Sequence, residues 1–537
     1  MNIRENNFRF SAKKPASNFW LKTLIVNLIL LGIIFRISNI EHKVYWHDEV
    51  YTVLRSGGYF SEDLTRSLFN NQVLTAQELR QYLDIKPQST IVDTLQSLAR
   101  EDPQHPPLYF LINRWWMQIW GTSLTALRSL PVLISLLSLP AIYYLTRELF
   151  PQSLASLLSI LLLSLSPLDI LFAPVSRQNS LWTFLVIISS YCLLKALRSQ
   201  ENKYKMQWWG LYCLSCLAGF YTHLYFILTY IAQVLIFLIA IVSYPHFRYH
   251  IKAWIISNSL ILLGIFPWVM VMVHNYSRAL SVTSWSQGRY SLDTVKLWFL
   301  NATALLVDLD LGFNHPLTYV ARLPFLLVLL VSCYWLGRQQ SRFICLFLFS
   351  LAGLPWLLLI CSDLASGSQR STVGRYLIAC YPFLQIIMAY GLAYFLATGQ
   401  KWRYGLIALL LSCTVISNTI NSFSLTSWSK TPSNGNIEAS QLIRQAKTPL
   451  IVTDRGNYFT NLGNILALSY TLPINTPIGL LTYPTQTPML ADVLAQHQGT
   501  VFVYDPSDRL LASLAALGHQ ALLVQPEGRL FKLKVSD

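Results

Sequence analysis

Charged side chains are scarce in this 537-residue chain. Asp, Glu, Lys and Arg together make up 12% of the residues, whereas hydrophobic residues make up 53%. Soluble domains have about twice that charged fraction, so the composition excludes an ordinary soluble protein. Repeated apolar runs of about 20 residues, each long enough to cross a bilayer, predict a polytopic α-helical membrane protein instead.

Acidic residues are the scarcer sign of charge. The chain has 25 Asp and Glu against 40 Lys and Arg, a formal net charge of +15. Such an excess can indicate a nucleic-acid-binding protein when it forms one basic patch. Here the basic residues gather in short turns between apolar runs, which is typical of the cytoplasmic loops of membrane proteins. The charge pattern therefore argues against nucleic acid as a partner.

Cysteine is absent from the large polar loops and from the C-terminal tail. The eight cysteines all lie in or beside apolar runs: Cys192, Cys213, Cys216, Cys333, Cys345, Cys361, Cys380 and Cys413. This placement argues against a disulfide framework. Cys213 and Cys216 have C-x-x-C spacing, but inside a hydrophobic segment, so we interpret them as packing residues rather than as a metal or redox pair.

Eleven apolar segments are predicted to span the membrane. Their approximate ranges are 19–40, 125–146, 153–173, 179–198, 207–221, 224–243, 253–273, 318–337, 343–361, 376–397 and 404–421. The first follows the basic residues Arg4, Arg9, Lys13 and Lys14, as the core of a signal peptide would. It is too long for such a core and has no small-x-small cleavage site, so we interpret it as an uncleaved first span.

Basic residues fall in every second turn between these segments. They are Arg147, Lys195, Arg198, Lys203, Lys205, Arg248, Lys252, Arg338, Arg342, Lys401 and Arg403. Because cytoplasmic loops are enriched in Lys and Arg, this predicts a cytoplasmic N-terminus and an extracytoplasmic C-terminus. The opposite face then has three loops, at 41–124, 274–317 and 362–375.

The first of these loops contains an apolar, Trp-rich stretch, HPPLYFLINRWWMQIWG, at 105–121. As a span it would invert every later loop and move the basic turns outside. We therefore predict an interfacial helix along the outer membrane surface, anchored by Trp115, Trp116 and Trp120.

The composition changes at about residue 422. Short β-type runs follow: PLIVTDR (449–455), TVFVYD (500–505), ALLVQ (521–525) and RLFKLKV (529–535). Helix-like stretches at 436–446 and 488–497 separate them. We predict a membrane domain at 1–421 and a small extracytoplasmic α/β domain at 422–537. The tail has no glycine-rich phosphate loop, so its expected role is to recognise an acceptor or to close over a site.

An acid pair, Asp48 and Glu49, follows the first span directly. At the water–lipid boundary such carboxylates can act as a general base or bind a metal ion, with a pKa tuned by partial burial. The alternative is an ordinary polar loop that happens to follow a helix.

Three arginines are expected at the same face. Arg177 lies in the turn SPLDILFAPVSRQNSLW (166–182), at a depth where a charge is costly unless it is paired or in use; snorkelling is the alternative. Arg370 and Arg375 lie in SGSQRSTVGRYLIACYPF (366–383), against the positive-inside trend, and suit a phosphate. His223, in the outer turn YTHLYF, is by itself more often a structural residue. Carboxylates facing arginines in a cavity open to lipid suit a donor with a lipid tail, a phosphate and a transferable group.

These motifs resemble those of the GT-C membrane glycosyltransferases, and more narrowly glycosyltransferase family 39, which includes protein O-mannosyltransferases and the aminoarabinose transferase of lipid A. YWHDEVYT (45–52) resembles the family's first-loop segment, and HPPLYFLINRWW (105–116) its HPPL helix. Residues 126–150 are similar to its second-span pattern, and YTHLYF and GRYLIACYPF match later segments. The resemblance covers most of residues 19–400.

The resemblance implies transfer of a sugar, hexose or pentose, from a polyprenyl-phosphate donor to a lipid, glycan or protein acceptor. The reaction would take place at the extracytoplasmic face of a bacterial plasma membrane. Asp48 would be the general base, and Glu49 would orient the acceptor or the first loop. The expected substrate-binding residues are Arg177, Arg370 and Arg375 for the phosphate, His105 and His223 for the sugar or acceptor, and Tyr376.

One departure from the family concerns the second outer loop. Many bacterial relatives have a Gln-Glu pair where this chain has Pro174 and Val175. The second-loop carboxylate is therefore missing, which leaves metal assistance, donor preference and full activity open. Relatives can use a divalent metal ion, but the sequence has no clear ligand set, so no metal ligand is predicted.

Two other functions remain open at this point. A lipid-linked sugar transporter or flippase would also suit eleven spans, although there is no inverted repeat and the polar groups cluster at one face rather than at the midplane. A catalytically degenerate relative would bind the lipid phosphate without transferring the sugar, which Val175 in place of the family glutamate favours.

Overall fold

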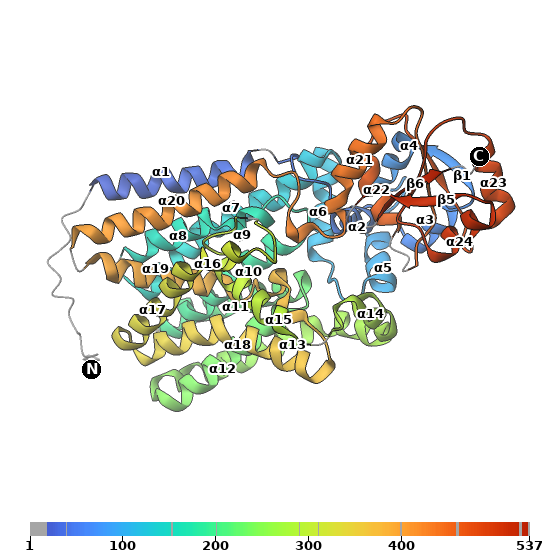
Figure 1. The fold of residues 1–537 in the computed structure, drawn as a ribbon. Helices are drawn as coiled ribbons and strands as arrows, with labels where there is room; N and C mark the ends of the chain where they lie inside the picture. The colour runs from blue at the N-terminus through green and yellow to red at the C-terminus, as the bar shows by residue number, and fades with distance from the viewer. Residues whose placement is uncertain are drawn as a thin grey trace.

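The computed structural model describes residues 19–534 with short gaps at 39, 152–153, 200, 289, 310, 398–399, 458–460 and 526–528. A long helical bundle has a smaller α/β region at the end opposite the start of its first helix (Figure 1). The basic N-terminal residues used to predict the orientation, Arg4, Arg9, Lys13 and Lys14, lie outside the described residues, as does the side chain of Lys203.

All eleven predicted spans are helical. They are α1 (Phe19–Ile37), α7 (Leu124–Leu149), α8 (Ala155–Leu165) with α9 (Pro167–Phe172), α10 (Asn179–Arg198), α11 (Asn202–Thr222), α12 (Phe226–Ser243), α13 (Ile251–His274), α17 (Leu323–Gln339), α18 (Arg342–Ser366), α19 (Tyr381–Ala397) and α20 (Lys401–Phe423). Among the described residues, eight helices are long and apolar enough to cross a membrane, and α8 and α19 are apolar but shorter. α11 begins with the polar sequence NKYK. The predicted class, a multi-pass helical membrane protein, is confirmed.

The third predicted span is interrupted rather than continuous. Pro167 starts α9 after α8 has ended, and the Ser166 hydroxyl accepts a hydrogen bond from the Asp169 N–H at 3.3 Å. A proline cannot continue the backbone ladder, so carbonyls at the end of α8 need other donors. Arg36, buried in α1, donates to the carbonyls of Leu163 (2.6 Å) and Ser164. A buried charge is thereby satisfied at the break that leads toward Arg177.

The loops that the sequence predicted to lie outside the membrane carry short helices. The first loop folds into α2 (His47–Gly57), α3 (Ser61–Leu68), β1 (Gln72–Thr75), α4 (Ala76–Arg80), α5 (Ile91–Glu101) and α6 (Leu108–Trp120), and the second into α14 (Tyr276–Thr283), α15 (Leu292–Thr303) and α16 (Pro316–Val320). α6 falls within the predicted interfacial helix. Its Trp115 and Trp120 are 58% and 62% exposed, whereas Tyr109 and Phe110 are buried. One exposed aromatic face is what an interfacial helix requires; its depth in the membrane stays a prediction.

The α/β region is built on a six-stranded sheet with the order β1-β3-β2-β4-β6-β5. Its C-terminal elements are β2 (Leu450–Thr453), β3 (Pro477–Leu480), β4 (Val501–Tyr504), β5 (Gln520–Leu523) and β6 (Leu530–Lys534), with α21 (Asn436–Gln445), α22 (Asn461–Thr471), α23 (Thr487–Ala495) and α24 (Asp508–Ala516). The four predicted strands are present, and β3 is an addition. Strand β2 lies between β3 and β4 and is parallel to both.

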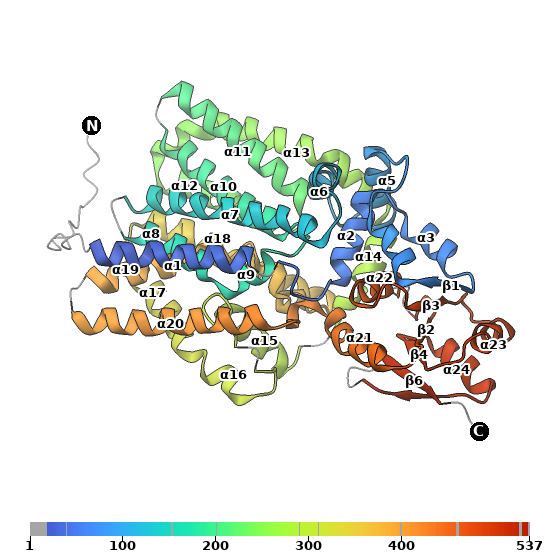
Figure 2. The ribbon, with the colours of Figure 1, turned by 90° about the horizontal axis from the view of Figure 1, so that it is seen from above.

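The edge strand β1 comes from the first loop. It pairs antiparallel with β3, with Gln72 opposite Leu480 and Thr75 opposite Pro477. Figure 2 shows the first-loop elements α3 and β1 beside the C-terminal sheet. Two segments about 400 positions apart, with the membrane bundle between them in the sequence, therefore share one sheet.

Candidate active site

Asp48 lies in the first turn of α2, where the helix dipole favours a negative charge. Its side chain is 22% exposed. The Asp48 Oδ2 atom is 3.8 Å from Arg177 Nη2 and 4.0 Å from Arg375 Nη2. The structure thus brings together a carboxylate and two guanidinium groups from three segments that are far apart in the sequence.

The arginines decide the protonation state of Asp48. Burial alone would raise the pKa of its carboxyl group, but the positive charges of Arg177 and then Arg375 outweigh burial and hold the pKa below its usual value. Asp48 is therefore an ionised carboxylate at neutral pH, able only to accept hydrogen bonds or a proton.

Arg177 lies in the turn between α9 and α10 and has partners on both sides. Its Nη1 donates to Thr52 Oγ1 at 3.1 Å, and its Nη2 is 3.4 Å from His105 Nε2. The Gln178 side chain is 3.1 Å from the other ring nitrogen of His105. Burial, followed by the charge of Arg177, lowers the pKa of His105 to about 4. His105 is therefore a neutral imidazole next to the carboxylate.

Arg375 is surrounded by aromatic rings. It lies in the 3₁₀ turn η5 (Gly374–Leu377), not at the head of the tenth span as predicted, because α19 begins only at Tyr381. Its guanidinium carbon is 5.3 Å from the Trp46 ring centroid, 5.4 Å from that of Trp285 and 5.5 Å from that of Tyr376. Contacts of this kind stabilise a cation without neutralising it, so Arg375 keeps its charge for an anionic ligand.

Arg370 lies in the neighbouring turn η4 (Arg370–Thr372) but has different partners. Its Nε donates to Ser286 Oγ at 3.2 Å, and its backbone N–H donates to Asp363 Oδ1 at 3.0 Å. The buried Asp363 carboxylate also accepts from the Ser371 N–H at 2.7 Å and from the Ser368 hydroxyl at 2.5 Å. Asp363 therefore folds the loop that carries both arginines, and Arg375 is the one beside Asp48.

The His223 side chain is packed against neighbouring aromatic rings. Its ring stacks on Trp182 with a centroid separation of 4.0 Å and an interplanar angle of 5°. Its Nδ1 accepts a hydrogen bond from the Tyr225 N–H at 3.1 Å, which shapes the turn after α11. The Tyr225 ring in turn contacts Tyr376 edge to face at 4.8 Å. His223 and Tyr376 thus form part of the wall behind Arg375.

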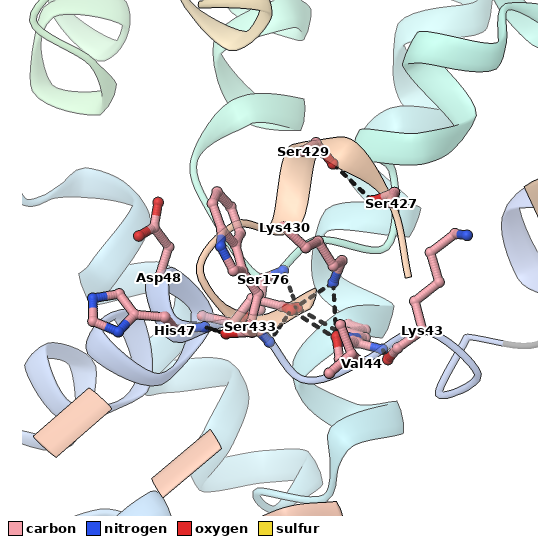
Figure 3. Close-up of polar contacts among 12 residues, drawn as sticks. Lys43, Val44, His47, Asp48, Ser176, Ser427, Ser429, Lys430 and Ser433 are labelled. Atoms are coloured by element: carbon pink, nitrogen blue, oxygen red, sulfur yellow. Dashed lines mark hydrogen bonds and ion pairs between the residues drawn. The ribbon is translucent and has the colours of Figure 1, made fainter. Parts of the chain in front are cut away.

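Glu49 has an environment opposite to that of Asp48. Its fully buried carboxylate accepts hydrogen bonds from two side chains and two backbone N–H groups: Arg128 Nε and Nη2 (both 2.9 Å), Lys430 Nζ (2.9 Å), Trp46 N–H (3.1 Å) and Ser176 N–H (3.0 Å). Burial would raise its pKa, but Arg128 and Lys430 lower it to about 2. Figure 3 shows the Asp48 carboxylate directed away from Lys430. The two adjacent carboxylates therefore face different surroundings: Asp48 faces the arginines, and Glu49 faces Arg128 and Lys430.

Arg128 and Lys430 were not singled out in the sequence. A signal was present for Arg128, because it is a charged residue in the apolar run of α7, where an unpaired charge is costly. Lys430 follows α20 among polar residues, and no local pattern connects it to Glu49, 381 positions away. With Arg128, it gives the buried carboxylate two cations, and burial with repulsion from Arg128 lowers the pKa of Lys430 to about 7.

The second-loop departure from the family is also visible. Val175 is buried in the hydrophobic core of the bundle, and the next residue, Ser176, donates its N–H to Glu49. Within the described part of the chain, no group of three or more His, Cys, Asp or Glu is placed to hold a metal ion. The charged groups around Asp48 are arginines.

Residues 104–271 match the family model described as dolichyl-phosphate-mannose-protein mannosyltransferase. The predicted resemblance is confirmed. The match includes α6, the turn with Arg177 and the turn with His223. Among curated proteins, none matches the sequence.

Solved structures are similar in fold over at least 90% of this chain. ArnT from Cupriavidus metallidurans in the apo state has a TM-score of 0.53 at 12% identity, over 96% of this chain and 97% of that one. The same protein bound to undecaprenyl phosphate has a TM-score of 0.51 at 13% identity, over 97% and 99% of the two chains. The archaeal oligosaccharyltransferase AglB from Archaeoglobus fulgidus, in complex with an inhibitory peptide and a dolichol-phosphate, has a TM-score of 0.51 at 12% identity, over 90% and 69%. The predicted GT-C fold is confirmed.

Proposed function

We propose that this protein is a glycosyltransferase that moves a sugar from a polyprenyl-phosphate donor to an acceptor hydroxyl at the extracytoplasmic membrane face. The proposal rests mainly on one observation: the Asp48 Oδ2 atom lies within about 4 Å of the Nη2 atoms of Arg177 and Arg375. The lipid phosphates bound to the similar ArnT and AglB structures and the donor named by the matching family model support a lipid-phosphate donor.

The groups present suit the bonds that change. The acceptor oxygen attacks the anomeric carbon, the bond from that carbon to the phosphate oxygen breaks, and the phosphate leaves with the electron pair. Arg177 and Arg375 would stabilise the charge on the departing phosphate. Asp48 would take the proton from the acceptor hydroxyl. A phosphate bound between the arginines would share their charge, which weakens their hold on Asp48 and makes it a better base.

The other predicted residues take supporting roles in this proposal. Glu49, saturated and buried, would orient the first loop rather than the acceptor. His105, neutral and in contact with Arg177, could bind a sugar hydroxyl. Arg370 would contribute to phosphate binding less than Arg375, since its contacts hold the loop together. His223 and Tyr376 would shape the wall.

We also propose the orientation and the location. Arg147, Arg198 and Arg338 lie in the last turns of their helices, α7, α10 and α17. Basic helix ends of this kind favour the cytoplasmic side, so the site lies on the extracytoplasmic side. This proposal places the protein in a bacterial plasma membrane with its N-terminus cytoplasmic. A hexose or pentose donor and a lipid, glycan or protein acceptor all remain within it.

The test uses purified protein and a radiolabelled polyprenyl-phosphate sugar. Asp48→Asn should lower transfer at least about 100-fold, the range expected for a lost general base, with the protein level unchanged. Asp63→Asn, which changes an exposed acid on α3 of the same loop, is the matched control and should not affect transfer. Survival of transfer in D48N would defeat the proposal.

The same preparation distinguishes the two competing functions. Translocation of labelled donor across vesicles without product would indicate a transporter. Donor binding without product or translocation would indicate a degenerate relative, which the buried Val175 keeps open.

A further inference from the structure

The segment that joins α20 to the α/β region runs alongside the residues that immediately precede Asp48. We call residues 424–433 the strap. Its contacts with the residues just before Asp48 come from backbone and side chains alike: Val44 N–H to Leu425 O (2.8 Å), Trp46 Nε1 to Thr431 O (3.0 Å) and His47 N–H to Ser433 Oγ (2.9 Å). The strap therefore runs alongside the entry to α2 over several consecutive residues.

Lys430 is the charged member of the strap, and it is almost completely buried. Its Nζ donates to Glu49 Oε2 at 2.9 Å and to the Val44 carbonyl at 3.1 Å. Figure 3 shows these contacts converging on one side of the α2 entry, with Asp48 on the other. Arg128 of α7 holds the same carboxylate from the bundle. The first turn of α2 is thus fixed between a membrane helix and the C-terminal strap.

A second contact ties the same turn to the α/β region itself. His47 Nδ1 lies 2.7 Å from Asn464 Oδ1 of α22, and Asn464 Nδ2 donates to Asp505 Oδ2 at 2.6 Å. His47 precedes Asp48, and Glu49 follows it. Both neighbours of the proposed base are therefore held by residues of the C-terminal region.

We infer that Lys430 is a positioning residue: through Glu49 it sets the direction in which Asp48 faces Arg177 and Arg375. The inference rests on the proposed function. Successive side chains on a helix are about 100° apart, so fixing Glu49 also fixes the direction of Asp48. Misplacement of a reacting group by about 1 Å can cost about 100-fold in rate, so loss of this hold should affect the chemical step more than donor binding.

The first test compares two lysines at the contact between the strap and the entry to α2: Lys430 of the strap, and Lys43, whose side chain donates to the strap. Lys430→Met removes the ammonium group that donates a hydrogen bond to Glu49. Lys43→Met is the matched control, because Lys43 Nζ donates to the carbonyls of Asn421 (2.7 Å) and Ser424 (3.0 Å) but not to Glu49. We expect K430M to lower kcat at least about tenfold with the donor KM within about threefold, and K43M to leave both within about threefold. Equal losses in the two variants would mean that the strap is only structural and would overturn the inference.

A double-mutant cycle asks whether Lys430 acts through Glu49. Residues of one hydrogen-bonded network are non-additive, whereas independent residues multiply their effects. In a Glu49→Gln background, K430M should therefore lower kcat further by less than about threefold. Full multiplication of the two effects would show a separate role for Lys430 and would also overturn the inference.

Amide hydrogen exchange of the full-length protein in detergent separates this inference from the proposed function. K430M should speed exchange in residues 44–52 at least about tenfold, and K43M should not. If the wild-type protein transfers no sugar, the proposed function fails, but the exchange result still tests the hold on α2. Unchanged exchange in K430M would overturn the inference. If K430M does not accumulate, Lys430→Gln replaces it, and wild-type kcat and exchange in K430Q would equally overturn the inference.

Discussion

Asp48 and Glu49 are adjacent in the chain, yet their surroundings differ in almost every respect. Asp48 keeps 22% of its side chain exposed and has arginines at 3.8 and 4.0 Å, whereas Glu49 is fully buried and accepts from four groups. The sequence indicated that an acid pair after the first span is chemically important. The resemblance gave the two acids different roles, but the sequence could not predict their surroundings, because the side-chain partners of Glu49 are 79 and 381 positions away.

Removal of Arg177 should change the pH dependence of activity. In the wild-type protein the two arginines hold the pKa of Asp48 below its usual value, so the base stays ionised into the acidic range. In Arg177→Gln the burial contribution gains weight and the pKa of Asp48 rises. The acidic limb of the kcat/KM profile, which reports the free enzyme, should move to higher pH in the remaining activity. Initial rates across the acidic and neutral range measure this.

Arg100→Gln is the control for this shift. Arg100 is an exposed residue of α5 in the first loop, which also carries Asp48, and its partner is the Phe60 ring. Its replacement should leave the acidic limb in place. A limb that stays in place in R177Q, or moves to lower pH, would mean that Asp48 is not the titrating base.

At the scale of elements, the loop after α18 determines where the arginines lie. Gly367 ends α18 with φ +66, a conformation that favours glycine, and the chain then turns back over the Asp363 carboxylate. Two backbone N–H groups and one hydroxyl converge on that carboxylate. The sequence predicted a short outer loop with two arginines there, but it extended the following helix back to residue 376. The acidic residue that shapes the loop lies on the preceding helix and has no local signature.

Asp363→Ala should therefore weaken donor binding. The backbone N–H groups of Arg370 and Ser371 would lose their acceptor, and each buried unsatisfied group costs about 1–3 kcal/mol. The loop is then free to adopt other conformations, and we expect the donor KM to rise about tenfold or more with a smaller change in kcat. Asp293→Ala, at an exposed acid of α15 that pairs with Lys296, is the control. An unchanged donor KM in D363A would show that the loop does not hold the phosphate.

At the scale of the whole molecule, the helices of the bundle were predictable from the sequence, but only four of the six strands of the sheet were. Apolar length gave eleven segments, and each proved helical. Four tail strands followed from their β-type runs. β1 is four residues long, QVLT, and its partner β3 lies about 400 positions away. A strand that exists because of a distant partner has no signal in its own sequence, so the joining of the first loop to the C-terminal region was not foreseen.

The shared sheet predicts that the C-terminal region does not fold stably alone. Every residue of α22 from Asn461 to Ser469 is buried, and α22 packs against α2 and α4 of the first loop as well as covering the sheet. Without that loop, a fragment of residues 436–537 would expose this apolar face and the open edge of β3. Exposed faces and edges of this kind favour association. The fragment alone should elute as aggregates and melt without cooperativity when measured by gel filtration and circular dichroism.

Addition of a second fragment, residues 41–124, should restore a soluble complex with a cooperative melt, because it supplies β1, α2 and α4 together. Leu74→Pro in that fragment is the matched control. Leu74 lies opposite Ile478 in the β1–β3 ladder, and a proline there removes a backbone donor and disfavours the strand. The L74P fragment should rescue less than the unaltered one. A different outcome would contradict this prediction: a monomeric 436–537 fragment with the same melt in the presence and absence of residues 41–124. It would show that the C-terminal region folds as an independent domain and that the sheet is stable without β1.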